Sequence, residues 1–295
     1  MSLIKTGIKS VVRRSYYLTR KVRYRSLVRQ LSSHPPLVVF QMGKVGSSSV
    51  TESLKEMDAP FELFHLHVLT HEGIERVHGE YRHASKVHHR PMIARHIVES
   101  DYLRRQLDRN DPGATWKIIS LVRDPVARNI STFFQSLCIY FPELCVGDQQ
   151  IFSDERIPEL LETYLEQWDG HHTPLHWFQT ELEPVFGIDV YAHPFPKDKG
   201  YQIIESGAVS LLLLRLEGLN STAGPAMEEF LGLRGLELSN HNVAEKKPYA
   251  GAYHAFKNRL RLPGAYLDTL YESEYARHFY TEREISGFRQ RWQVI

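Results

Sequence analysis

The chain has 295 residues, 42% of them hydrophobic and 24% charged, so it is long enough to bury a core and too apolar to be disordered. Its 36 basic and 35 acidic side chains leave a net charge of +1, which excludes a protein that is basic throughout and gives no sign of a nucleic-acid partner. Two cysteines exclude a disulfide-rich scaffold and a Cys-rich zinc module, and we expect Cys138 and Cys145 to be buried free thiols.

The basic residues are concentrated at the start of the chain. Residues 1–51 carry ten Lys or Arg and no acidic residue. We interpret residues 1–34 as a basic arm, either a solvated helix or a segment that contacts an anionic membrane or glycan. The sequence has no apolar run long enough for a transmembrane helix and no apolar core between the early charges that would indicate a signal peptide. We therefore expect a cytoplasmic protein whose only membrane contact is peripheral.

Residues 35–295 are predicted to form one domain, in which strands alternate with helices. Residues 37–40 predict a short buried strand, and Val50, Leu54 and Met57 then recur at helical spacing. The later predicted elements are strands at 116–122, 190–191 and 209–216, a helix from Pro125 through Phe134, helices at 158–168 and 175–186, and a helical tail from Pro263. This alternation is typical of the α/β class, and we predict a three-layer α/β/α domain with a central parallel sheet.

The loop at residues 41–49 has the composition of a phosphate site. Gly43 and Gly46 allow backbone N–H groups to turn inward at the start of a helix, Lys44 adds a charge, and serines 47–49 add hydroxyl groups. The order differs from Walker A, because the lysine precedes the second glycine and no Lys-Ser/Thr pair follows it. A magnesium-dependent nucleoside triphosphatase is therefore disfavoured. A tight strand-to-helix turn with incidental serines is the structural alternative.

A second candidate phosphate site follows the strand predicted at 116–122. Arg123 stands at the end of that strand, and its planar guanidinium suits a phosphate. Ser131 follows eight residues later, which in a helix returns it to the same sector as Arg123. The alternative is that Arg123 pairs locally where the following helix begins.

Together these motifs resemble the sulfotransferase superfamily. Its first loop is similar to Pro-Lys-Thr-Gly-Ser-Thr/Ser, and residues 43–48 here are Gly-Lys-Val-Gly-Ser-Ser. Its second motif is an Arg followed eight residues later by a Ser, as at Arg123 and Ser131. Residues 214–219, Leu-Arg-Leu-Glu-Gly-Leu, resemble its Arg-Tyr-Glu-Asp-Leu strand end. Over residues 36–295 the chain is most similar to a capsular polysaccharide synthesis family of sulfotransferase-like proteins.

This resemblance implies a P-loop-like sulfotransferase fold and a specific donor. The donor would be 3′-phosphoadenosine 5′-phosphosulfate, with its phosphosulfate on the first loop and its 3′-phosphate on the second motif. A basic loop late in the chain would close over it. The donor-binding residues that the resemblance assigns are Lys44, Val45, Gly46, Ser47, Ser48, Ser49, Arg123, Ser131 and Lys247.

The expected reaction moves a sulfuryl group to a hydroxyl of a carbohydrate or polysaccharide. Lys44 is the candidate for stabilising the charge that grows on the departing oxygen, so the scheme requires no metal. Residues 61–96 hold half of the 16 histidines, and a histidine is a suitable base near neutral pH. By position and resemblance His96 is the first candidate. His65 and His67 share one face of a predicted strand and are the alternatives, followed by the carboxylates of Glu99 or Asp101.

Three other interpretations stay open at this stage. The histidine pairs could chelate a metal, although no His-Glu-x-x-His motif occurs. The protein could be another nucleotide-dependent transferase of the same fold. It could also bind a nucleotide or glycan as a polysaccharide assembly protein without turnover.

Overall fold

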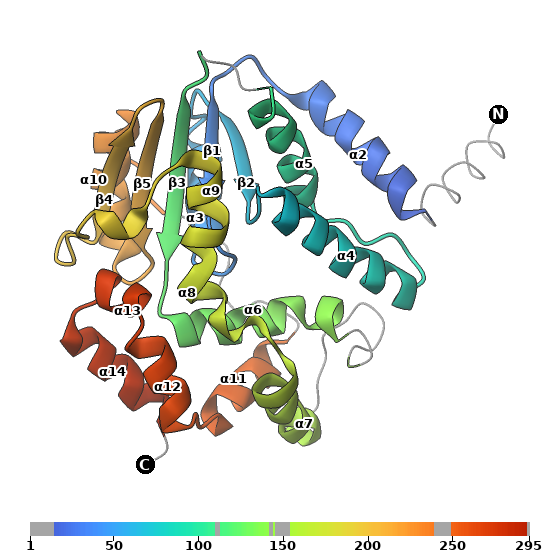
Figure 1. Ribbon diagram of the computed structural model, residues 1–295, viewed down its shortest axis with the longest axis vertical. Coiled ribbons are helices and arrows are strands. Elements are labelled where there is room, and N and C mark those ends of the chain that lie inside the picture. The colour runs from blue at the N-terminus through green and yellow to red at the C-terminus, as the bar shows by residue number, and fades with distance from the viewer. Residues whose placement is uncertain (1–14, 110–112, 142–143, 145–153, 239–248, 294–295) are drawn as a thin grey trace.

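A central sheet of five strands organises the protein. The computed structural model describes residues 15–109, 113–141, 144, 154–238 and 249–293 (Figure 1). The strands follow the order β2-β1-β3-β5-β4, and every neighbouring pair is parallel except β4 and β5. The bounds are Pro36–Phe40 for β1, Glu62–Leu66 for β2, Trp116–Val122 for β3, Tyr201–Ser206 for β4 and Val209–Arg215 for β5. The protein is thus a mixed α/β protein, as predicted, with a mostly parallel sheet.

Two predictions about the strands are wrong. The sheet is not wholly parallel, because β4 forms an antiparallel hairpin with β5 across a two-residue turn. Gly207 has φ +58° in that turn, a conformation that glycine adopts at little cost. The strand predicted at 190–191 is instead a 3₁₀ turn, Val190–Ala192, in which the Asp189 carboxylate accepts a hydrogen bond from the Tyr191 N–H.

Helices cover both faces of the sheet and continue beyond its carboxyl edge. Figure 1 shows α9 crossing in front of the sheet and α3 behind it. The helices are α2 Tyr16–Gln30, α3 Ser47–Glu56, α4 His71–Val87, α5 Arg95–Leu107, α6 Pro125–Tyr140, α7 Ile157–Glu162, α8 Thr173–Trp177, α9 Glu183–Phe186, α10 Leu219–Leu231, α11 Ala250–Arg259, α12 Gly264–Tyr271, α13 Glu274–Phe279 and α14 Glu282–Trp292. Since both faces of the sheet are covered, the central strands are continuous apolar runs, and residues 37–40 are fully buried.

A second hydrophobic core lies past the carboxyl ends of the strands. In it, Ile130, Phe133 and Phe134 of α6 pack against Phe256 of α11 and Leu267 of α12. The sheet has its own core, built from the strands, α3 and α10. The protein therefore has two large apolar clusters, which meet where β3 passes into α6, and a smaller third cluster beside α2.

The side chain of Asp124 joins these two clusters. It is 1% exposed and accepts hydrogen bonds from the Val126 N–H at 3.1 Å, the Tyr271 hydroxyl at 2.8 Å and the Trp292 indole at 3.4 Å. Its own N–H donates to Glu217 Oε1 at 2.8 Å. Burial raises the pKa of Asp124, and these donors offset part of that effect. One carboxyl group therefore fixes α6, α12 and α14 against the end of β3.

Two expectations outside the sheet also need correction or restriction. Cys138 is disulfide-bonded, so a free thiol was the wrong expectation there, and Cys145 lies outside the described residues. The basic arm is described from Ser15 onward, where it forms α2 and buries Tyr16 and Leu27. In the described part of the chain, no helix is both long and apolar enough to cross a membrane.

We predict that Tyr271→Phe destabilises the protein by about 1–3 kcal/mol, because it removes a hydrogen bond to a buried carboxyl group without changing shape. Chemical denaturation measures this loss. Tyr17→Phe removes the same hydroxyl from a side chain that is 62% exposed and should change the free energy of unfolding little. Equal stability of Tyr271→Phe and the parent protein would show that Asp124 does not depend on this partner.

Candidate functional site

A cavity of about 790 Å³ opens at the carboxyl ends of the parallel strands, where ligands bind in open α/β sheets. It brings together eleven residues that the sequence singled out: Gly43, Lys44, Gly46, Ser47, Ser48, Ser49, His65, His67, His96, Arg123 and Ser131. The Val45 side chain is fully buried and is not among the cavity-lining residues. Lys247 lies outside the described residues.

The loop between β1 and α3 presents an uncapped helix start to this cavity. Gly46 is the N-cap residue of α3, with φ +91°, and therefore offers no side chain to the first N–H groups of the helix. This backbone conformation favours glycine, and a Cβ at Gly46 would in addition lie 2.4 Å from Leu216 Cδ1, so the end of that side chain would have to move. Uncapped N–H groups at the positive end of a helix favour an anion.

Two arginines at the start of α6 hold this loop from the other side. Arg123 Nη1 donates to the Lys44 carbonyl at 3.0 Å, and Arg128 Nε donates to the Gly43 carbonyl at 3.1 Å. The Tyr275 hydroxyl fixes the Arg123 backbone, accepting from its N–H at 3.1 Å and donating to its carbonyl at 2.8 Å. The Arg123 side chain thus pairs with the first loop, 79 residues away in the sequence, and fastens the two motifs to one another.

Arg128 is the cavity residue that sequence reasoning missed. It is 4% exposed, and the hydrogen bonds it donates to described residues go to neutral oxygens, at Gly43 and Asn129. Burial lowers the pKa of Arg128 to about 10, which still leaves it charged at neutral pH. Its position, one helical turn before Ser131 in the second motif, was the signal available in the sequence. A buried cation without a carboxylate at hand is suited to an anionic ligand.

The cavity as a whole carries positive charge. Among the described residues, its lining includes five Lys or Arg side chains and a single carboxylate, Glu80. That carboxylate already pairs with Arg76 at 2.8 Å, and burial raises the pKa of Glu80. A concave site with this excess of cations attracts anions. The cations are Lys44, Arg76, Arg123, Arg128 and Lys257.

The three candidate bases converge on the loop but differ in their contacts. His65 Nε2 lies 2.9 Å from Ser47 Oγ and 3.1 Å from Gln41 Nε2, so it positions the loop. His67 Nδ1 lies 3.0 Å from the Gln41 carbonyl, which requires a proton on Nδ1 and leaves the lone pair on Nε2. The His96 ring centroid lies 4.9 Å from that of His67.

All three imidazoles are neutral at physiological pH. Burial lowers the pKa of His65 to about 3 and that of His67 to about 4, and repulsion from neighbouring cations adds to the effect. Burial also lowers the pKa of His96 well below its usual value. Each ring can therefore accept a proton throughout the physiological range.

The two carboxylates that were the last candidates for the base make their contacts outside the cavity. Glu99 accepts hydrogen bonds from the His65 N–H at 2.9 Å and from Arg95 at 2.6 Å, and Asp101 contacts His78 and Arg20. Neither lines the cavity. Within the described residues, no three His, Cys, Asp or Glu side chains are grouped so that they could hold a metal ion.

The far wall comes from segments whose place the sequence motifs did not indicate. Tyr253, His254 and Lys257 of α11 line it, together with Trp168 and Trp177. In the third motif, by contrast, only Leu216 reaches the cavity. Arg215 forms an ion pair with Glu284 at 2.9 Å, and Glu217 holds the Asp124 backbone, so these two residues stabilise the fold.

Lowered histidine pKa values have a consequence for stability. Between pH 6.5 and about 4 the unfolded chain binds a proton at His67 that the folded protein does not, so stability falls as the pH falls. We predict that His67→Gln makes the slope of unfolding free energy against pH shallower by up to about 1.4 kcal/mol per pH unit. Denaturation at several pH values measures the slope. His34→Gln, at an exposed position, is the matched control, and an unchanged slope in His67→Gln would contradict the prediction.

Comparison with known proteins gives one finding. Residues 156–281 match the model of a family described as "Putative capsular polysaccharide synthesis protein". Comparison with curated proteins and with solved structures finds no significant match. The matched segment supplies the far wall of the cavity, including Trp168 and Tyr253, and contains neither the loop at 41–49 nor Arg123. The chain is thus similar, over this segment, to a family linked to polysaccharide synthesis.

Proposed function

We propose that the protein is a sulfotransferase that moves a sulfuryl group from 3′-phosphoadenosine 5′-phosphosulfate to a hydroxyl of a carbohydrate. The observation that carries the proposal is a cavity that combines three features. The uncapped start of α3 faces it, Arg123 and Arg128 hold the adjoining loop, and three neutral histidines line it. The family similarity to capsular polysaccharide synthesis proteins supports a carbohydrate acceptor.

The positive charge of the cavity fits a donor with two phosphate groups. The N–H groups and serines at the start of α3 would bind the phosphosulfate, with Lys44 beside it. Arg123 and Ser131 line the same cavity and would bind the 3′-phosphate. Arg128 adds a charge that stays in place, because the Gly43 carbonyl and the Asn129 side chain orient it.

In the transfer step, the acceptor oxygen forms a bond to sulfur while the bond from sulfur to the bridging oxygen breaks. The nucleotide leaves as 3′-phosphoadenosine 5′-phosphate, and the hydroxyl proton passes to a base. Lys44 would stabilise the charge on the departing oxygen, a charge that exists mainly in the transition state. Its Nζ lies 3.3 Å from Gln135 Oε1, which keeps the ammonium group at the cavity wall.

Among the three histidines, we assign the base to His67 ahead of His96. The Gln41 carbonyl fixes its tautomer with the lone pair on Nε2, as a general base requires. A Cβ at Gly43 would lie 3.8 Å from that nitrogen, so the lone pair is beside the phosphate loop. The Nε2 of His65 is already engaged with Ser47 and Gln41, which favours a positioning role.

Donor recognition can be tested by calorimetry with 3′-phosphoadenosine 5′-phosphate. We expect Arg123→Ala to weaken its binding about ten- to a hundredfold, because a charged hydrogen bond is worth roughly 1.5–3 kcal/mol. Adenosine diphosphate lacks the 3′-phosphate, so its weaker binding should hardly change in the variant. Equal losses for both nucleotides would mean that Arg123 only holds the loop. If the parent protein binds neither nucleotide, the sulfotransferase proposal is wrong.

Turnover can be followed as release of 3′-phosphoadenosine 5′-phosphate from the donor in the presence of soluble polysaccharides. We predict that His67→Ala lowers the rate by about 10²–10⁴-fold and leaves donor affinity unchanged, as expected for a general base. His34→Ala, at an exposed position, should turn over normally. Because the pKa of His67 is about 4, the parent rate should fall only below that pH. Full activity of His67→Ala with loss in His96→Ala would move the base to His96.

A further inference from the structure

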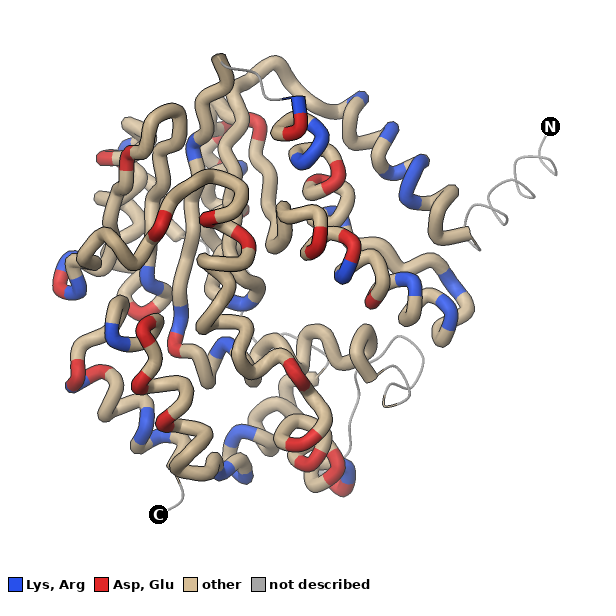
Figure 2. The backbone as a smooth tube through the Cα atoms, in the orientation of Figure 1, with Lys and Arg blue, Asp and Glu red and all other residues tan. Residues whose placement is uncertain are grey.

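Helix α2 carries exposed apolar side chains together with unbalanced positive charge. Six large hydrophobic side chains are exposed among the described residues, and four of them, Tyr17, Leu18, Val22 and Val28, belong to α2. The helix contains five basic residues and no acidic one. Figure 2 shows the blue positions along α2 with no red among them. Exposed apolar groups gathered on one element of a soluble protein mark an interaction site.

The two sides of α2 have different tasks. At 100° per residue, Tyr16, Arg20, Arg23 and Leu27 fall on one side of the helix. The outer face lies opposite to them, and we define it by its seven exposed residues: Tyr17, Leu18, Lys21, Val22, Arg25, Val28 and Arg29. Apolar and basic side chains alternate on this face.

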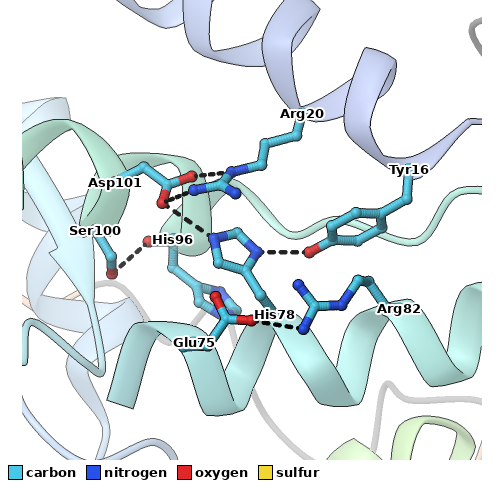
Figure 3. Close-up of polar contacts among 8 residues, drawn as sticks. All are labelled: Tyr16, Arg20, Glu75, His78, Arg82, His96, Ser100 and Asp101. Atoms are coloured by element: carbon cyan, nitrogen blue, oxygen red, sulfur yellow. Dashed lines mark hydrogen bonds and ion pairs between the residues drawn. The ribbon is translucent and has the colours of Figure 1, made fainter. Parts of the chain in front are cut away.

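The inner side of α2 packs against the rest of the protein. Figure 3 shows the Tyr16 hydroxyl against His78 Nδ1, at 2.7 Å, and His78 Nε2 against Asp101, at 3.0 Å. Arg20 donates two hydrogen bonds to the same carboxylate, at 2.7 and 2.5 Å. Leu27 completes a small apolar cluster with Ile93 and Val98. These buried polar contacts oppose rotation of α2, so its outer face cannot turn inward to bury its own apolar groups.

We infer that the outer face of α2 docks on the surface of an anionic lipid bilayer. A membrane interface satisfies both features of the face, because apolar side chains enter the headgroup region while Lys and Arg reach the lipid phosphates. A polyanionic glycan would use the charges and leave the four apolar side chains in water. The sequence before Ser15 extends the same character, with four basic residues and no acidic one. This inference is independent of the proposed function, because it concerns a surface outside the cavity.

Vesicle flotation of the full chain tests the inference. We expect binding to phosphatidylcholine vesicles that contain phosphatidylglycerol, and none to phosphatidylcholine alone. Each Lys or Arg near such a surface contributes roughly 1 kcal/mol, so Lys21→Glu with Arg25→Glu should weaken binding by more than about tenfold. Leu18→Ser with Val22→Ser should weaken it by a similar factor, because the apolar contact is lost while the charge of the face is unchanged.

Matched variants elsewhere on the protein are the controls. Lys199→Glu with Arg234→Glu reverses two charges near α10, which Figure 1 places on the opposite side of the molecule from α2. Leu165→Ser alters an apolar side chain with 41% exposure outside α2. Both should bind as the parent does. Circular dichroism checks that every variant is folded, which we expect because the changed side chains are exposed.

Three results would overturn the inference. The first is that the parent protein fails to bind anionic vesicles. The second is normal binding by the Leu18→Ser, Val22→Ser variant together with loss in the charge variant, which would indicate a purely electrostatic site for a glycan. The third is normal binding by both α2 variants, which would place the lipid contact outside α2. Should either pair unfold the protein, Val28→Ser and Arg29→Glu repeat the test from the far end of the same face.

Discussion

The buried carboxyl group of Asp124 is the contact on which the site depends. It caps α6 at the point where β3 ends, and it accepts hydrogen bonds from Tyr271 of α12 and Trp292 of α14. The second apolar core is thereby held against the edge of the sheet, and the cavity lies between them. Because Arg123 is the preceding residue and Arg128 follows one turn later, the same junction orients the two arginines that hold the loop between β1 and α3.

Burial away from water accounts for two features of the cavity, the charged arginine and the neutral histidines. Arginine resists deprotonation, so Arg128 stays charged even though it is buried. An imidazole in the same surroundings loses its proton, because its usual pKa is near 6.5. One low-dielectric cavity thus holds fixed cations and neutral proton acceptors side by side. This combination suits a reaction that binds a phosphorylated donor and takes a proton from an acceptor.

Helix α2 shows that a basic segment can belong to the folded body and still face outward. The ion pair and hydrogen bonds through Arg20, His78 and Asp101 attach its inner side to α4 and α5. Val77, the neighbour of His78 on α4, lines the cavity, so the same helix separates the outer face of α2 from the site. Asp101, which the sequence analysis named as an alternative base, is one of the residues that hold α2 in place.

The sequence by itself determined those parts of the site that rest on local geometry. A strand, a glycine-containing loop and a helix follow one another within residues 36–56. Arg123 directly precedes a helix that begins at Asp124 and Pro125. Such features depend on neighbouring residues, and the structure brings both motifs to one cavity. The placement of His65 and His67 on a strand holds only in part: His65 belongs to β2, whereas His67 follows directly after the strand ends at Leu66.

Only the tertiary structure decided what depends on distant segments. The direction of β4 follows from a two-residue turn, and no periodic pattern encodes that direction. The roles of Tyr271 and Tyr275 and the far wall from α11 arise from contacts across more than a hundred residues, and Arg128 reaches the Gly43 carbonyl across 85 residues. The tautomer of His67 likewise depends on the Gln41 carbonyl, which packing places against its ring. Hydrogen-bond partners and the burial of charged groups depend on which segments come together in the folded protein. Local sequence patterns do not specify these long-range contacts.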